Sequence, residues 1–157
     1  MNIIRNILLA AMISGAATSS VLASGEIVRN NPDTIHSPFG VYTHAVTVPA
    51  GADMIYIAGQ TGLDKDGKTV AGGIEEQTRQ TLANLNAILE AEGLTADDLV
   101  SMTIYLTDID NLPGSSAERR AFFKSGKYPA GTLLIVKSLA EPDLLIEIDA
   151  VAARVAK

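Results

Sequence analysis

The sequence predicts an α+β domain in which a mixed β-sheet carries two helices on one face, in the order β-β-β-α-β-α-β-β. Three observations lead to this prediction: one long apolar repeat of helical period, β-rich segments on both sides of it, and short turn-forming segments between them. A chain of 157 residues can build one such domain with a proper core, but it is too short for two ordinary domains.

The N-terminal residues 1–23 have the pattern of a secretory signal peptide. Arg5 supplies the positive charge, an apolar stretch follows, and Val21-Leu22-Ala23 presents small residues where a signal peptidase cleaves. The apolar stretch is too short for a membrane span. We therefore expect cleavage after Ala23 and a periplasmic or secreted protein that does not stay attached to a membrane.

Two segments follow the signal peptide. Residues 24–39 are polar and contain Pro32 and Pro38, which predicts an extended, loop-like lead-in. The domain itself is then expected over residues 40–157.

The first half of the domain is expected to begin with strands. Residues 42–48 and 54–59 are rich in β-formers, and the short turn Pro49-Ala50-Gly51 between them predicts a β-hairpin. A further strand end is expected at Thr61, before a tight turn at Asp66-Gly67.

The clearest element is a helix over residues 75–92. Its apolar stripe recurs at steps of three and four, and the chain reaches a glycine at position 93, the usual residue after a helix C-terminus. A second, shorter helix is expected over 115–124, with its two phenylalanines in the core. Strands are expected over 99–106, 132–136 and 144–151.

Composition excludes several kinds of site. The chain has no cysteine, so it has no disulfide, thiol nucleophile or Cys-ligated zinc. It carries 12 basic and 18 acidic residues, and this net charge of −6 repels phosphate backbones, so no nucleic-acid partner is expected. No phosphate-binding loop, dinucleotide fingerprint or metal-ligand spacing is present, and no cofactor or metal is expected.

Several segments, in this order and spacing, resemble the RidA (reactive intermediate deaminase, or YjgF) family. The resemblance covers nearly all of residues 40–153 and rests on Tyr42-Thr43-His44-Ala45-Val46, Ala58-Gly59-Gln60, the helical segment 76–85 with Asn84, Pro129-Ala130-Gly131-Thr132 and the closing segment 146–152. It implies a homotrimer with small-molecule pockets between subunits. It also implies hydrolysis of enamines and imines to a keto acid and ammonia.

Such hydrolysis needs a group to place water, a cation to hold the substrate carboxylate and a closed pocket. Glu147 is the candidate for water placement, because strand alternation turns it away from the face that holds Ile146 and Ile148. On the sequence pattern alone, a solvated strand carboxylate is the favoured explanation of Glu147, and the resemblance is what favours a role in the site. Tyr42 is a candidate pocket wall, with His44 on the same side of the strand, and the resemblance adds Gly59 and Gln60 to the pocket.

Three positions depart from the family pattern. Gly131 stands where the family's deaminases have arginine, so this position cannot hold a carboxylate. Ser116 replaces a frequent asparagine, and Leu133 a frequent cysteine. Neither Lys127 nor Lys137 is expected to substitute for the arginine, because Lys137 lies about 20 Å along the strand and Lys127 is expected to be solvated.

The sequence leaves three functions open. The first is a trimeric protein that binds a small molecule, such as a carboxylate or an imine, with altered or absent deaminase activity. The second is an active deaminase with a different substrate anchor. The third is an RNA-cleaving or translation-inhibiting protein, which the acidic charge disfavours. Export also disfavours the ordinary deaminase role, because short-lived enamines arise inside cells.

Overall fold

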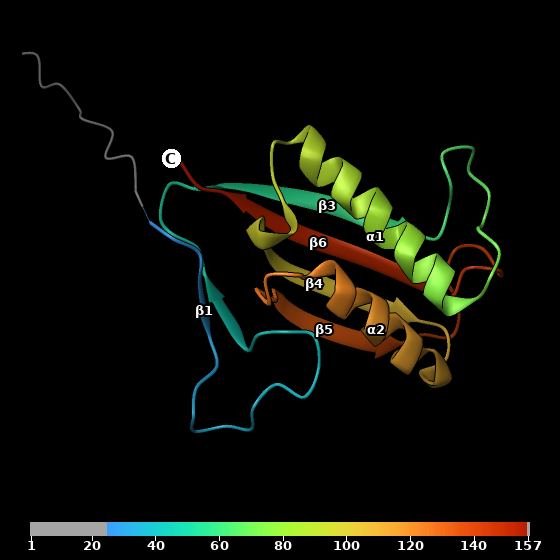
Figure 1. Cartoon of the computed structure of the whole chain (residues 1–157), viewed down its shortest axis with the longest axis horizontal. Coiled ribbons are helices and arrows are strands. Elements are labelled where there is room, and N and C mark those ends of the chain that lie inside the picture. The colour runs from blue at the N-terminus through green and yellow to red at the C-terminus, as the bar shows by residue number, and fades with distance from the viewer. Residues whose placement is uncertain (1–24, 157) are drawn as a thin grey trace, which may run out of the picture.

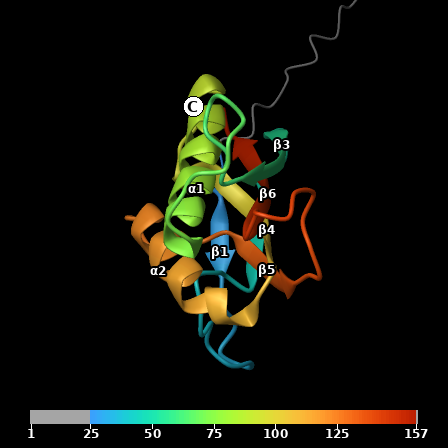
Figure 2. The same ribbon diagram turned by 90° about the vertical axis from the view of Figure 1, so that its right-hand side faces the viewer.

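The computed structural model describes residues 25–156 and shows a four-stranded sheet in the order β3-β6-β4-β5, with both helices on one face (Figures 1 and 2). The strands β4 and β5 are parallel and the other pairs are antiparallel, so the sheet is mixed. The predicted α+β fold is therefore confirmed. The bounds of these elements are β3 Asp53–Thr61, α1 Ile74–Ala91, β4 Leu99–Leu106, α2 Leu112–Phe122, β5 Ala130–Ile135 and β6 Ile146–Arg154.

Two short strands, β1 Val28–Asn30 and β2 Ala45–Thr47, form a separate antiparallel pair. Single 3₁₀ turns precede β4 and α2, at Ala96–Asp98 and Ile109–Asn111. The predicted signal peptide lies outside the described residues. Within residues 25–156, no helix has the length and apolar character needed to cross a membrane.

The core lies between the helices and the sheet. The stripe predicted on the first helix is buried along its whole length, and β6 alternates strictly between buried and half-exposed residues from Ile146 to Ala150. Ile146 and Ile148 are fully buried against the helices, so Glu147 and Asp149 lie on the other face of the sheet. The strand alternation predicted from the sequence is correct here.

The predicted hairpin between residues 42–48 and 54–59 is wrong. β2 pairs with β1, whereas β3 pairs with β6. The reason lies in Thr43, whose backbone N–H donates to Pro129 O at 2.8 Å and whose hydroxyl donates to Tyr128 O at 2.8 Å. These bonds hold the segment beside β5, at the opposite edge of the sheet from β3, so a local turn cannot pair the two.

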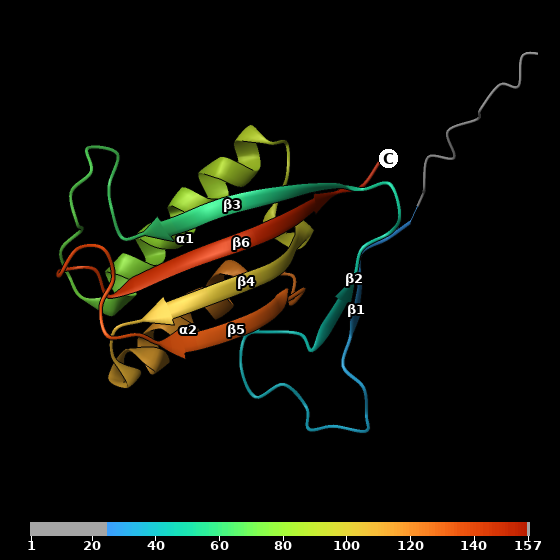
Figure 3. The ribbon, with the colours of Figure 1, turned by 180° about the vertical axis from the view of Figure 1, so that it is seen from behind.

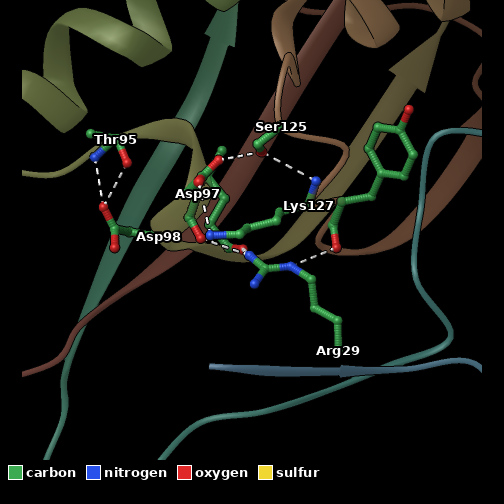
Figure 4. Close-up of polar contacts among 8 residues, drawn as sticks. Arg29, Thr95, Asp97, Asp98, Ser125 and Lys127 are labelled. Carbon is green, nitrogen blue, oxygen red and sulfur yellow. Dashed lines mark hydrogen bonds and ion pairs between the residues drawn. The ribbon is translucent and has the colours of Figure 1, made fainter. Parts of the chain in front are cut away.

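The predicted loop-like lead-in contains β1, and its arginine ties it to the domain. Arg29 reaches from β1 and donates to three backbone carbonyls, those of Asp97 (2.7 Å), Leu99 (3.0 Å) and Tyr128 (3.0 Å) (Figure 4). Burial lowers the pKa of Arg29, and the nearby Asp97 partly offsets this effect. Arg29 and the pairing of β1 with β2 therefore attach the lead-in to the rest of the domain.

Replacing Arg29 with methionine is expected to lower the free energy of unfolding by about 1–2 kcal/mol, because three carbonyls lose a charged donor. Amide hydrogen exchange should become faster at Val28–Asn30 and remain unchanged in β4. An unchanged exchange rate in β1 would show that other contacts hold the lead-in. Replacing Lys65, whose only ion pair is to its exposed neighbour Asp66 among the described residues, is the matched control and should change little.

The face of the sheet opposite the helices is bare in the single chain (Figure 3). Tyr56 of β3 is 80% exposed, and Met54 and Leu134 are also exposed. Apolar side chains on a broad open sheet face are typical of a surface that another subunit covers.

Candidate functional site

A cavity of about 540 Å³ lies between α2, β5 and the segment that leads into β2. It is partly open to solvent and brings together four of the predicted site residues: Tyr42, Ser116, Gly131 and Leu133. Its remaining lining is His36, Phe39, Gly40, Val41, His44, Ile104, Leu112, Arg119 and Thr132. No carboxylate is among these residues.

The hydrogen bonds of Thr43 place one wall of this cavity. Because Thr43 is fixed against Tyr128 and Pro129, its neighbours Tyr42 and His44 turn to the opposite side of the segment, toward the cavity. The prediction that His44 shares a pocket with Tyr42 is therefore consistent with the structure.

Four aromatic rings stand together on this wall. The ring of Tyr42 makes edge-to-face contacts with Phe39 (centroids 5.8 Å apart) and His44 (5.4 Å), and His36 contacts both Phe39 and His44. His44 Nε2 lies 2.8 Å from the carbonyl oxygen of His36, which fixes the imidazole. Phe39 is 88% exposed at the rim, so the wall offers a flat apolar surface to a ligand.

Gly131 faces Tyr42 from β5. A Cβ atom built on Gly131 would lie 3.0 Å from the Cβ of Tyr42, and the glycine backbone is not in the left-handed region. A larger side chain could therefore be placed here if Tyr42 shifted by a few tenths of an ångström. The absence of a side chain at position 131 leaves this part of the cavity without a cation of its own.

Arg119 supplies a cation that the sequence analysis missed. This residue of α2 is only 5% exposed, and its guanidinium donates to Ser116 Oγ at 3.1 Å. Burial, and to a smaller extent Arg120, lowers the pKa of Arg119 to about 10. The side chain therefore remains protonated at neutral pH.

A signal for Arg119 was present in the sequence. Leu112, Ser115, Arg119 and Phe122 recur at steps of three, four and three, which places all four on one face of a helix. A charged residue in such a stripe points toward the core, where a charge without a partner is unusual.

The other predicted site residues, Gly59, Gln60 and Glu147, are not in this cavity. Gly59 and Glu147 line a groove of about 340 Å³ on the bare face of the sheet, beside Tyr105 and Asp149. The carboxylate of Glu147 lies directly over Gly59, and a Cβ atom at position 59 would overlap it. Gln60 donates to the carbonyls of Ala58 (3.0 Å) and Gly59 (3.3 Å), so its amide is used locally.

The groove has its own polar pair. Tyr105 donates to Asp149 Oδ2 at 3.0 Å, and this hydrogen bond raises the pKa of Tyr105. The carboxylate of Glu147 and the cavity around Gly131 lie on opposite faces of the sheet, so a single chain does not bring them together.

Among residues 25–156, no cluster of three or more His, Asp or Glu side chains could hold a metal ion.

The fold and the cavity define a small α+β protein with a pocket at the sheet edge, and comparisons with known proteins identify its family. The family model described as Endoribonuclease L-PSP matches residues 33–154. The human 2-iminobutanoate/2-iminopropanoate deaminase is 35% identical over 129 residues, which cover 80% of this chain and 90% of the enzyme. The chain belongs to the RidA family.

Solved structures agree with this assignment. A Rid-family protein of unknown function from Yersinia pestis, YyfB, is 35% identical with a TM-score of 0.74, and the match covers 80% of this chain and 97% of the other. TdcF of E. coli, solved with bound serine, is 28% identical with a TM-score of 0.61, covering 74% and 91% of the two chains.

Proposed function

We propose that this chain forms a homotrimer through the bare face of its sheet, and that each cleft between subunits binds a small molecule. Deaminase activity of the kind found in its relatives is altered or absent. The observation that carries the proposal is the cavity beside Gly131, which has an aromatic wall but no side chain at position 131.

The bare face supports the assembly. It exposes Tyr56, Met54 and Leu134 and also carries Glu147. A second subunit on this face would cover the apolar side chains and could bring its own Glu147 toward the cavity of its neighbour. Both groups of candidate residues would then contribute to one cleft.

The relatives support the ligand class. The human deaminase acts on imino acids, and the TdcF structure contains serine, an amino acid with a carboxylate. A pocket of this size with few polar groups suits a small molecule with a planar or apolar body. The export predicted from residues 1–23 would also make encounters with short-lived cytoplasmic imines rare, which favours a different ligand.

A second candidate is an imine deaminase whose substrate is anchored elsewhere than at position 131. Arg119 favours this candidate, because it places a cation in the same cavity. The RNA cleavage suggested by the name of the family model is disfavoured by the net charge of −6.

Imine hydrolysis by the purified protein tests the proposal. An amino-acid oxidase generates imines in the assay, semicarbazide traps those that survive, and Gly131→Arg is compared with the wild type. We expect the wild type to leave the trapped imine unchanged. Accelerated loss of imine by the wild type would contradict the proposal and establish the deaminase candidate.

Light scattering tests the assembly separately. We expect a mass of three chains for both the wild type and Gly131→Arg. A monomeric mass would remove the basis for a cleft between subunits, whatever the hydrolysis assay shows.

A further inference from the structure

Arg119 is buried without the partners that a guanidinium normally has. Its Nε atom has no hydrogen-bond partner, and within the described part of the chain no carboxylate lies within 4 Å of it. Among residues 25–156, the one hydrogen bond of its side chain is to the hydroxyl of Ser116, one turn earlier on α2. A buried charge of this kind is costly to the folded state, so an arginine that serves only packing would be a poor choice here.

Arg119 is buried at the border of the cavity. Arg119 and Ser116 both line the cavity of about 540 Å³, which Gly131 and the aromatic wall also line. No acidic residue of the same chain lines this cavity, so among residues 25–156 no carboxylate in it competes with a ligand for the charge. The residue with the unpaired Nε–H is therefore also one that lines the cavity.

We propose that Arg119 is the anchor for a small carboxylate in this cavity, with Ser116 holding its guanidinium in position. This inference rests on the proposed function, because it requires the cavity to bind a small molecule. Arginine offers two parallel N–H donors to the two oxygens of a carboxylate, and the pairing is strong where water is excluded.

The rest of the cavity defines the ligand more closely. Tyr42 and Phe39 offer ring surfaces, and Leu112, Ile104 and Leu133 add apolar contacts. The ligand class is therefore a monocarboxylate with a short apolar or planar body. A doubly charged acid is disfavoured because, among residues 25–156, Arg119 is the one arginine or lysine that lines the cavity.

Binding of two probe pairs tests the proposal: benzoate with benzamide, and butanoate with butanamide. The members of each pair have nearly the same shape and differ in charge. We expect the wild-type protein to bind the carboxylates about 10- to 100-fold more tightly than the amides in calorimetric or NMR titrations.

Variants of two adjacent arginines provide the decisive comparison. Arg119→Met should weaken carboxylate binding at least about tenfold and leave amide binding unchanged. Arg119→Lys should retain part of the carboxylate affinity, because lysine keeps the positive charge but lacks the two parallel N–H donors of arginine. Arg120 is the next residue on the helix and is exposed, so Arg120→Met should bind both probes like the wild type. Circular dichroism of each variant verifies that it is folded.

The possible outcomes distinguish a failure of the Arg119 anchor from a failure of the proposed function. Wild-type affinity in Arg119→Met would overturn the anchor and leave a small-molecule cavity in place. Equal binding of acid and amide by the wild type would do the same. If the wild type bound neither member of either pair, both the anchor and the proposed cavity function would fail for this ligand class.

Discussion

Replacing Arg119 with methionine is expected to raise the free energy of unfolding of the ligand-free protein by about 1–4 kcal/mol. Burial lowers the pKa of Arg119 to about 10, so the charged form is less stable in the folded chain than in the unfolded chain. Methionine has a similar length and no charge, and it can occupy the same space without this cost. Urea unfolding at pH 7 measures the difference.

The stability difference between Arg119→Met and the wild type should also depend on pH. As the pH rises above about 10, the folded chain releases the Arg119 proton before the unfolded chain does, so the free energy of unfolding rises with pH. The advantage of Arg119→Met over the wild type should therefore shrink as the pH rises above 10. Arg120→Met should differ from the wild type by no more than about 0.5 kcal/mol.

A loss of stability in Arg119→Met would contradict this expectation. It would show that the guanidinium is paired in the assembled protein, for example with a carboxylate of another subunit, and that its role is structural. Added benzoate should raise the melting temperature of the wild type and leave that of Arg119→Met unchanged, because only a folded state that binds the ligand is stabilised.

Replacing Ile148 with alanine is expected to lower the free energy of unfolding by about 2–5 kcal/mol. Ile148 is fully buried between β6 and the helices, so the smaller side chain leaves a cavity in the core. Its neighbour Glu147 points to the other face, and Glu147→Gln should change stability by no more than about 0.5 kcal/mol. Chemical unfolding of the two variants compares adjacent positions on one strand.

Similar losses at both positions would contradict the alternation on β6. They would indicate that Glu147 is also packed in the assembled protein, and that its placement in an open groove applies only to the single chain.

The sequence predicted the elements whose residues repeat with a clear period. The helix expected over 75–92 is observed at Ile74–Ala91, and the strand expected over 99–106 has those same bounds. These patterns reflect burial on one face, which is a local property of the sequence. The turn at Asp66-Gly67 also forms: Gly67 has a φ of 75°, and Asp64 Oδ1 accepts from the N–H groups of Asp66 and Lys68.

Long-range pairing was harder to predict. The hairpin was inferred from two neighbouring β-rich segments, but Thr43 bonds to residues more than eighty positions later. The strand β1 was missed because three residues are too few to show an alternating pattern. It is held in place by hydrogen bonds from Arg29 to residues far along the chain. The local sequence around Thr43 and Arg29 does not indicate either of these long-range contacts.

The candidate site was predicted in part. Tyr42, Ser116, Gly131 and Leu133 do share a cavity, but Glu147, Gly59 and Gln60 lie outside it in the single chain. Lys127 and Lys137 neighbour β5 in the sequence, but neither of them lines the cavity. The cation that lines the cavity is Arg119, which comes from α2 and lies farther from β5 in the sequence.

The Nε–H resonance of Arg119 in a ¹H–¹⁵N NMR spectrum tests the central claim most directly, and its absence from the spectrum of Arg119→Lys assigns it. We predict a downfield shift of this resonance when benzoate is added, because the free Nε–H gains a charged acceptor, and no such shift with benzamide. Binding of benzoate without a change in this resonance would contradict the claim that Arg119 anchors the ligand.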